Sequence, residues 1–161
     1  MAEPRKKPLI SHGTAAQNRR ARFDYKLGEV MEAGIVLLGP EVKSLRAGRA
    51  SLGEAWAGER NGEIFLFNCH ISEWQAGSVV AKFDPLRPRK LLLHKKQVRE
   101  LTGAVTREGA TLVPVEIRFN DKGRAKVLIA LATGKKQHDK RADIAKRDWQ
   151  RDKARLMRDK G

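Results

Sequence analysis

The chain has 161 residues, a length that suits one domain, and it carries a formal net charge of +15 with 33% charged residues. Cys69 is its only cysteine, so no intramolecular disulfide can form. The first residues are charged and no long apolar run follows them, so we expect neither a signal peptide nor a membrane span, and we expect a cytoplasmic protein.

The positive charge is concentrated at the two ends of the chain. Residues 1–22 contain six Lys or Arg and one Glu, and residues 134–161 contain eleven Lys or Arg and five Asp. The middle is nearly balanced, with 17 basic and 13 acidic residues. Basic flanks around a balanced middle are typical of a folded module that grips the phosphates of a nucleic acid.

The first third of the chain predicts an arm, two strands and a helix. Residues 1–17 mix Pro, Gly, Ser and Lys without periodicity and indicate a mobile basic arm. Apolar and polar residues alternate over 23–27, and residues 33–38 form a short apolar run, so both segments indicate strands. Residues 41–47 then predict a short helix that ends at Gly48.

The middle third predicts a hairpin, a loop and a second helix. Asn61-Gly62 is the pair favoured in type I′ turns, so it indicates a β-hairpin. Residues 77–90 contain two prolines and four basic residues, and we expect an exposed loop there. The apolar residues of 94–105 recur at helical spacing, and Gly109 lies beyond the predicted end of this helix.

The clearest strand pair follows. Apolar residues alternate over 113–119, a turn is expected at 120–123, and the alternation resumes over 127–131. Pro114 indicates an edge strand or a bulge. Several short strands and two short helices in so small a chain favour an all-β-dominated small barrel over a doubly wound sheet.

Residues 134–161 form a charged tail with scattered apolar residues, too few to stabilise a core. Asp143 and Arg147, like Asp148 and Arg151, are nevertheless spaced as ion pairs on a helix. The pattern predicts a segment that becomes helical when it binds a polyanion. It lacks the wide apolar face of a membrane-surface helix.

Nothing in the sequence favours catalysis, and we expect no metal and no cofactor. Cys69 and His70 are adjacent, and no other histidine has ligand spacing to a partner. We expect Cys69 to pack as a small hydrophobe, and His70 to be either an RNA contact or a residue at the rim of the core. Residues 134–136 resemble the end of a phosphate-binding loop, but Ile129 stands where that motif needs glycine.

Three basic clusters lie on different predicted elements, which fits the backbone of a folded RNA. Their residues are Asn18, Arg19 and Arg20; Lys43, Arg46 and Arg49; and Arg87, Arg89 and Lys90. Spacing places the second cluster on one side of a helix, which is also how a merely solvated helix face looks. We find no pair of exposed aromatic residues for stacking bases, and no helix-turn-helix or zinc finger for DNA.

Five segments, in order, carry a resemblance to a known family. They are Asn18-Arg19-Arg20-Ala21-Arg22, Ala33-Gly34-Ile35, residues 41–48 (EVKSLRAG), residues 84–93 (DPLRPRKLLL) and residues 134–141 (GKKQHDKR). From about Asn18 to its C-terminus, the chain resembles the SsrA-binding proteins, also called small protein B, the bacterial partners of transfer-messenger RNA.

The resemblance implies a barrel of about six antiparallel strands of the oligonucleotide/oligosaccharide-binding type, with short flanking helices and a disordered basic C-terminal tail. It divides the chain into the arm at 1–17, an RNA-binding barrel at 18–133 and the tail at 134–161. The family binds the tRNA-like part of transfer-messenger RNA and delivers it to stalled ribosomes in trans-translation, without being an enzyme. A monomer is the default.

The resemblance and the basic clusters together define two sets of candidate residues. Those expected at the RNA-binding surface of the barrel are Asn18, Arg19, Arg20, Arg22, Glu41, Lys43, Ser44, Arg46, Arg49, His70, Arg87, Arg89 and Lys90. Those expected to bind the ribosome, at the decoding centre and along the mRNA channel, are Gly134, Lys135, Lys136, His138, Asp139, Lys140, Arg141, Trp149, Leu156 and Met157.

Glu41 needs its own explanation, because a carboxylate repels phosphate. It could accept a hydrogen bond from a base or a 2′-OH, or it could position a neighbouring arginine. Two other functions compete with the adaptor: a ribosomal or ribosome-assembly protein that binds ribosomal RNA, and an enzyme that acts on RNA.

Overall fold

The computed structural model describes residues 9–10, 12–76, 79–134 and 137–159. Its strands are β1 (Gly13–Gln17), β2 (Tyr25–Ile35), β3 (Ala50–Ser51), β4 (Trp56–Arg60), β5 (Glu63–Phe67), β6 (His70–Ile71), β7 (Trp74–Ala76), β8 (Val79–Ala81), β9 (Arg89–Leu92), β10 (Thr111–Phe119) and β11 (Ala125–Gly134). Its helices are α1 (Ala21–Asp24), α2 (Gly39–Arg46), α3 (Lys95–Glu108) and α4 (Gln137–Asp159).

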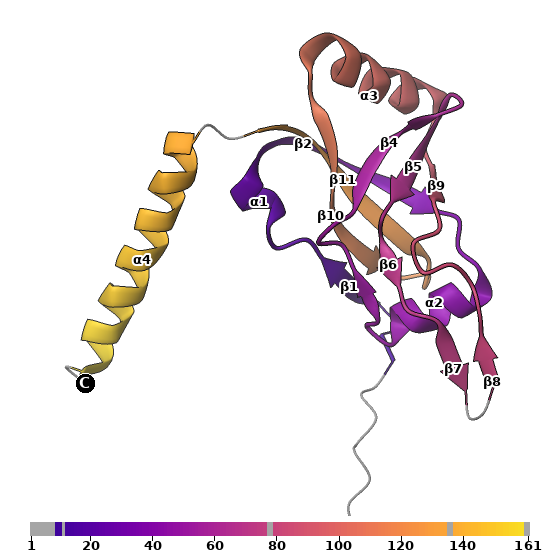
Figure 1. Ribbon diagram of the computed structural model, residues 1–161, viewed down its shortest axis with the longest axis horizontal. Coiled ribbons are helices and arrows are strands. Elements are labelled where there is room, and N and C mark those ends of the chain that lie inside the picture. The colour runs from indigo at the N-terminus through magenta and orange to yellow at the C-terminus, as the bar shows by residue number, and fades with distance from the viewer. Residues whose placement is uncertain (1–8, 11, 77–78, 135–136, 160–161) are drawn as a thin grey trace, which may run out of the picture.

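Six strands close into a ring of antiparallel pairs. The order is β10, β11, β2, β9, β5 and β4, and β4 returns to β10 where Ala57 lies opposite Leu112. β1 pairs with the other side of β10. α3 lies at one end of this ring, and α2 lies at the other end together with the β7–β8 hairpin (Figure 1). The expectation of a small, mostly antiparallel barrel with flanking helices is therefore confirmed.

The hairpin between β4 and β5 has the predicted turn. Asn61 and Gly62 have φ values of 53° and 78°, as both central residues of a type I′ turn require. This two-residue turn fixes the register, so that Ala57 lies opposite Leu66 and Trp56 opposite Phe67. Directly opposite residues share a face of a sheet. Since Ala57 and Leu66 are buried in the core, Trp56 and Phe67 lie on the outer face.

The predicted helix at 94–105 and the predicted strand pair are also present. α3 ends at Gly109, whose φ of 66° is the left-handed conformation that favours glycine. In β10 the register shifts between Pro114 and Glu116, the bulge that the proline indicated. Leu112 and Val113 are both buried next to this bulge, so the simple alternation expected for the strand is interrupted.

Two segments of the chain are more regular than the sequence suggested. Gly13–Gln17, expected to lie in the arm, forms β1 against β10, and Ala16 is buried there. Small residues pack closely on a neighbouring strand without showing a clear hydropathy pattern. Within the expected loop at 77–90, Val79–Ala81 forms β8, and β9 begins at Arg89.

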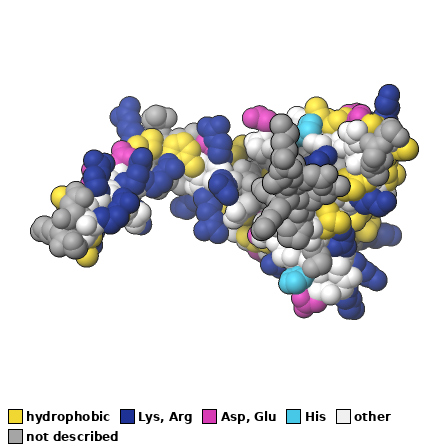
Figure 2. All heavy atoms as spheres, turned by 90° about the horizontal axis from the view of Figure 1, so that it is seen from below, with side chains coloured by type: hydrophobic (Ala, Val, Ile, Leu, Met, Phe, Trp, Pro, Cys, Tyr) yellow, Lys and Arg dark blue, Asp and Glu magenta, His cyan; other side chains and the backbone are white. Residues whose placement is uncertain are grey.

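The tail forms the helix α4 even though no partner is bound to the chain. This corrects the expectation that the free tail is disordered. α4 has ion pairs between Asp148 and Arg151 (2.6 Å) and between Asp152 and Arg155 (3.3 Å), each three residues apart. Lys and Arg side chains crowd its surface (Figure 2). It touches α1, where the guanidinium of Arg147 lies 4.8 Å from the ring centre of Phe23. The other predicted pair involves the side chain of Asp143, which lies outside the described part of the chain.

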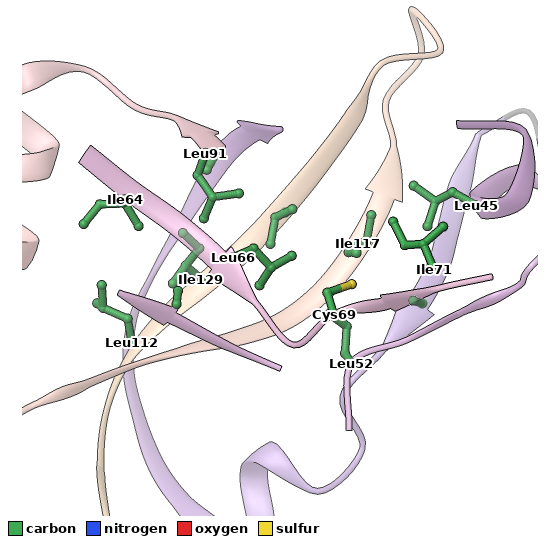
Figure 3. Packing of buried hydrophobic residues seen from close by; sticks show 14 of the residues in the cluster. Leu45, Leu52, Ile64, Leu66, Cys69, Ile71, Leu91, Leu112, Ile117 and Ile129 are labelled. Carbon is green, nitrogen blue, oxygen red and sulfur yellow. The ribbon is translucent and has the colours of Figure 1, made fainter. Parts of the chain in front are cut away.

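The main core fills the ring, and its buried residues run from Ala16 to Ile129. Figure 3 shows Cys69 packed among these residues, close to Leu52 and Ile71. Burial raises the pKa of the Cys69 thiol to about 11. The prediction that Cys69 packs as a small hydrophobe is confirmed, and the core is complete without α4.

Candidate nucleic-acid interface

Glu41 is the centre of a buried ionic cluster. It lies in the first turn of α2 and is completely buried. Its Oε1 accepts hydrogen bonds from the backbone N–H of Leu38 (2.7 Å) and from Arg87 Nη2 (2.5 Å). Its Oε2 accepts one from Arg89 Nε (2.5 Å). The carboxylate therefore caps its own helix and holds two arginines from the β8–β9 region.

Arg89 does not reach solvent. Its exposed fraction is 0%, and it also donates to the carbonyl oxygens of Cys69 (2.7 Å) and Pro85 (3.3 Å). The expectation that it lies in an exposed basic loop is wrong. Because β9 alternates, Arg89 and Leu91 point inward, whereas Lys90 and Leu92 point outward.

The environment of Glu41 keeps it ionised. Burial raises its pKa, but the hydrogen bonds from Arg87, Leu38 and Arg89, together with the charge of Arg89, outweigh burial and hold the pKa below its usual value. The carboxylate is out of reach of a ligand, so of the alternatives left open by the sequence, the positioning of arginine is the one that the contacts support. Arg87, whose side chain is 31% exposed, is the arginine that reaches the surface.

The predicted cluster on α2 does not form one helix face. Lys43 is exposed, but Ser44 is buried and donates from Oγ to the carbonyl oxygen of Ser72 (2.5 Å). Arg46 donates to the carbonyl oxygens of Ile10 (3.0 Å) and Gly123 (2.9 Å). Its guanidinium also covers the ring of Phe119.

Arg49 lies beyond the end of α2 and is exposed. His70 is exposed as well, and it faces Ser51 across the β3–β6 pair. Of the candidates near α2, Lys43, Arg49, His70 and Arg87 can therefore meet a ligand, while Glu41, Ser44 and Arg89 support the structure beneath them.

The N-terminal candidates gather at α1, away from α2 (Figure 1). Arg19, Arg20 and Arg22 are exposed. Asn18 is half-buried and donates from Nδ2 to the carbonyl oxygen of Pro114 (3.0 Å), which fixes this segment to the barrel. Apart from Lys90, the exposed barrel candidates thus form two separate basic regions, one at α1 and one near α2.

A groove between the barrel and α3 was missed in the sequence. Its volume is about 840 Å³, and its lining includes Glu32, Lys90, Leu92 and Lys126. Leu92 is 52% exposed, and Lys90 forms an ion pair with Glu63 on β5 (2.7 Å). Lys90 therefore belongs to this groove and not to the Arg87 cluster. The inward–outward alternation of β9 was the signal that could have separated them.

An aromatic cluster on the outer face was also missed. The rings of Trp56 and Phe67 are stacked, with centres 4.3 Å apart and planes at 21°, and Phe65 lies 6.2 Å from Phe67. Trp56 is 47% exposed. Phe67 and Phe65 are half-buried, so only Trp56 of this cluster is exposed, and the expectation that no pair of exposed aromatic residues exists is not overturned. Counting back from the Asn61-Gly62 turn would have placed Trp56 opposite Phe67.

The tail candidates follow β11, which ends at Gly134. Lys135 and Lys136 lie outside the described residues, as do the side chains of His138, Asp139 and Lys140. Arg141 is exposed on α4, and so are the apolar side chains of Trp149, Leu156 and Met157. These three large apolar residues have no part in the barrel core.

Two further observations limit the chemistry. Among the residues that the structure describes, no group of three or more His, Cys, Asp or Glu side chains could hold a metal ion. No helix in the same ranges is long and apolar enough to cross a membrane.

A closed antiparallel barrel with two exposed basic regions and a basic helical tail defines a class, the small nucleic-acid-binding barrel proteins. The family model described as SmpB protein matches residues 15–159, and the chain belongs to this family. It is a family of RNA-binding proteins that are not enzymes.

Curated relatives and a solved structure agree with this assignment. The chain is 63% identical to the SsrA-binding protein of Granulibacter bethesdensis, with 100% of both chains covered, and 60% identical to that of Acidiphilium cryptum, with 99% of this chain and 100% of the relative covered. A solved structure described as "tmRNA-SmpB: a journey to the center of the bacterial ribosome" is similar at 49% identity and a TM-score of 0.63. That similarity covers 81% of this chain and 87% of the other.

Proposed function

We propose that this chain is an RNA-binding adaptor of trans-translation, which binds the tRNA-like domain of transfer-messenger RNA and brings it to stalled ribosomes. The observation that carries the proposal is the likeness, at 49% identity, to a protein solved as tmRNA-SmpB in the context of the bacterial ribosome. The 63% identity to an SsrA-binding protein over the whole chain supports it. The working compartment is the cytoplasm, where ribosomes are.

The ring closed by β4 and β10 is a barrel of the oligonucleotide/oligosaccharide-binding type, and it forms the RNA-binding unit at 18–133. The complete core between Ala16 and Ile129 supports this division. The tail at 134–161 is a separate unit for the ribosome. It contacts the rest of the described chain chiefly at α1, so it can leave the barrel without opening the core.

RNA is bound by the exposed members of the predicted set, and the buried members position them. Arg87 is the clearest case, because Glu41 holds its guanidinium from beneath while part of the side chain stays in solvent. Arg19, Arg20 and Arg22 contact phosphates on the α1 side. The groove that contains Lys90 and Leu92 adds an apolar surface beside a positive charge.

The tail acts at the decoding centre and along the empty mRNA channel. Its first part, His138 to Arg141, occupies the position of a codon–anticodon pair. The exposed Trp149, Leu156 and Met157 make apolar contacts farther along. Exposed large apolar side chains on a charged helix support a role in contact with a partner.

Two measurements test the proposal together. Binding of the tRNA-like domain should be steeply salt-dependent: 6–10 phosphate contacts would weaken it by roughly 10³–10⁵ between 50 and 200 mM salt. A chain shortened after Thr133 should bind this RNA nearly as well as the full chain. Binding that is insensitive to salt, or that is lost with the tail, would contradict the proposal.

A further inference from the structure

The helical tail α4 meets the barrel chiefly at the short helix α1. The guanidinium of Arg147 lies 4.8 Å from the ring centre of Phe23, and the two helices touch. Figure 1 shows α4 on the α1 side of the barrel, away from α2 and the β7–β8 hairpin. Since Phe23 and Arg147 are far apart in the sequence, this contact exists only in the folded chain.

The contact lies within the basic region at α1. This helix is a single turn, Ala21–Asp24, which carries the exposed Arg22, and the exposed Arg19 and Arg20 come directly before it. A helix with its side chains is about 10–12 Å across. When α4 lies over Phe23, it therefore covers part of the surface that a phosphate backbone needs in order to reach these arginines.

The tail is held weakly in this position. Arg147 stays exposed although it lies over Phe23, and Ile144 and Trp149 on the same helix are 45% and 63% exposed. These side chains of α4 bury little apolar surface. An exposed cation–π contact favours the docked form by roughly 2- to 5-fold. A ligand with a modest preference for the undocked form can reverse such an equilibrium.

We propose that α4 is a latch, docked on α1 in the free chain and released when RNA occupies α1. The inference rests on the proposed function, because it needs RNA at the arginines of α1. The effect is reciprocal: by whatever factor RNA favours the released tail, loss of the latch favours RNA binding. The tail then becomes available to the ribosome mainly from a chain that already carries its RNA.

Paramagnetic relaxation measures the docking directly. The full chain with Gln150→Cys is labelled with a nitroxide at this exposed position of α4, while Cys69 is buried and stays unlabelled. In the free chain, the nitroxide should broaden the backbone amide signals of Arg22, Phe23 and Asp24, compared with the reduced label. Saturation with the tRNA-like domain of transfer-messenger RNA should restore these signals. No broadening in the free chain, or equal broadening with RNA bound, would overturn the proposal.

Phe23→Leu removes the aromatic ring and keeps both apolar volume and charge. In the full chain, this substitution should tighten binding of the tRNA-like domain by roughly 2- to 5-fold. In the chain shortened after Thr133 it should change nothing, because no tail remains to be released. Equal effects in the two chains would show that Phe23 acts on RNA without the tail, and would also overturn the latch.

Arg147→Gln tests the other half of the contact, with Lys146→Gln as its matched control. Each removes one positive charge from an exposed position of α4. Adjacent residues lie about 100° apart around a helix, so Lys146→Gln leaves Arg147 over the ring. Arg147→Gln should bind the RNA roughly 2- to 5-fold more tightly than Lys146→Gln. Equal affinities of the two variants would contradict the latch.

Combining the substitutions shows whether they act through one contact. Phe23→Leu added to Arg147→Gln should bring no further gain in affinity, because the contact is already broken. Circular dichroism confirms that each variant is folded. If the unmodified chain fails to bind the RNA, the proposed function fails. If it binds while α4 stays docked on α1, only the latch fails.

Discussion

Arg89 Nε donates to Glu41 Oε2 across 2.5 Å, and neither side chain is exposed to solvent. This pair ties α2 to β9 and so fixes the end of the barrel that carries the exposed Arg87. A buried charge pair is valuable here for geometry more than for stability, since desolvation offsets much of its attraction. Glu41 therefore has a structural role in this basic sequence, and its presence needs no contact between its carboxylate and RNA.

Removing the charge of Glu41 should destabilise the fold. Glu41→Gln leaves Arg89 buried without a counter-charge, and we expect a loss of about 3–5 kcal/mol in the free energy of unfolding. Urea denaturation measures it. Glu63→Gln is the matched control, because it breaks the exposed pair with Lys90 and should cost at most about 1 kcal/mol. Equal effects of the two substitutions would show that burial of the Glu41 cluster is not decisive.

The same carboxylate should make stability depend on acidity. The pKa of Glu41 lies below its ordinary value of 4.5, so its contribution is fully present above pH 4.5 and is lost as the pH falls toward the lowered pKa. Glu41→Gln should therefore flatten the decline of stability below pH 4.5, measured as the denaturation midpoint at each pH. An unchanged acid profile in this variant would assign the decline to other carboxylates.

The two arginines held by Glu41 should respond differently to substitution. Arg87→Ala should weaken binding of the tRNA-like domain and lower the salt slope by about one, with a smaller loss of stability than Arg89→Ala, because Arg87 reaches solvent and Glu41 keeps its bond to Arg89. Arg89→Ala should destabilise the fold by about 3–5 kcal/mol, since it removes the buried partner of Glu41 Oε2 and leaves this oxygen without a counter-charge in the interior. RNA titrations at several salt concentrations and urea denaturation separate the two. A salt slope unchanged by Arg87→Ala would remove Arg87 from the RNA-binding set.

Cys69 should be inert in the folded chain. Burial, aided by the charge of Glu41 and opposed by that of Arg89, raises the pKa of its thiol to about 11, so almost no thiolate exists at pH 8. A thiol reagent such as DTNB should react with it only after denaturation in urea. Rapid reaction of one thiol per native chain would contradict the packing of Cys69 in the core.

The helix of the tail should be sensitive to salt. Its ion pairs between Asp148 and Arg151 and between Asp152 and Arg155 are exposed, and each contributes only about 0.2–0.5 kcal/mol. Far-ultraviolet circular dichroism of a peptide spanning 134–161 should show partial helicity that declines as salt screens these pairs. Helicity independent of salt would mean that intrinsic propensity holds α4 together.

Short sequence motifs were sufficient to predict turns and bulges. Asn61-Gly62 predicted its hairpin because this pair is strongly favoured in type I′ turns, and Pro114 predicted its bulge because proline cannot donate a backbone hydrogen bond to a neighbouring strand. Arg89 was misplaced because its neighbours Arg87 and Pro88 resemble an exposed loop. Only the partners brought by the fold, Glu41 above all, allow a charged group in the interior.

The exposure of single charged residues could be predicted from the sequence, but contacts between residues that only the fold brings together could not. Arg19 and Arg20 are exposed as their charge suggested. The stacking of Trp56 on Phe67 depends on strand register, and the Lys90–Leu92 groove depends on the position of α3 against the barrel. Both are products of tertiary packing. The helical tail was expected only on binding, because its stabilising contact with Phe23 lies far away in the sequence.

The most direct test of the central claim is peptide tagging in a reconstituted translation reaction on an mRNA without a stop codon. With transfer-messenger RNA present, the full chain should support addition of the tag, and the chain shortened after Thr133 should not, although it still binds the RNA. Absence of tagging with the full chain, or equal tagging with both chains, would contradict an adaptor in which the barrel binds the RNA and the tail reads the ribosome.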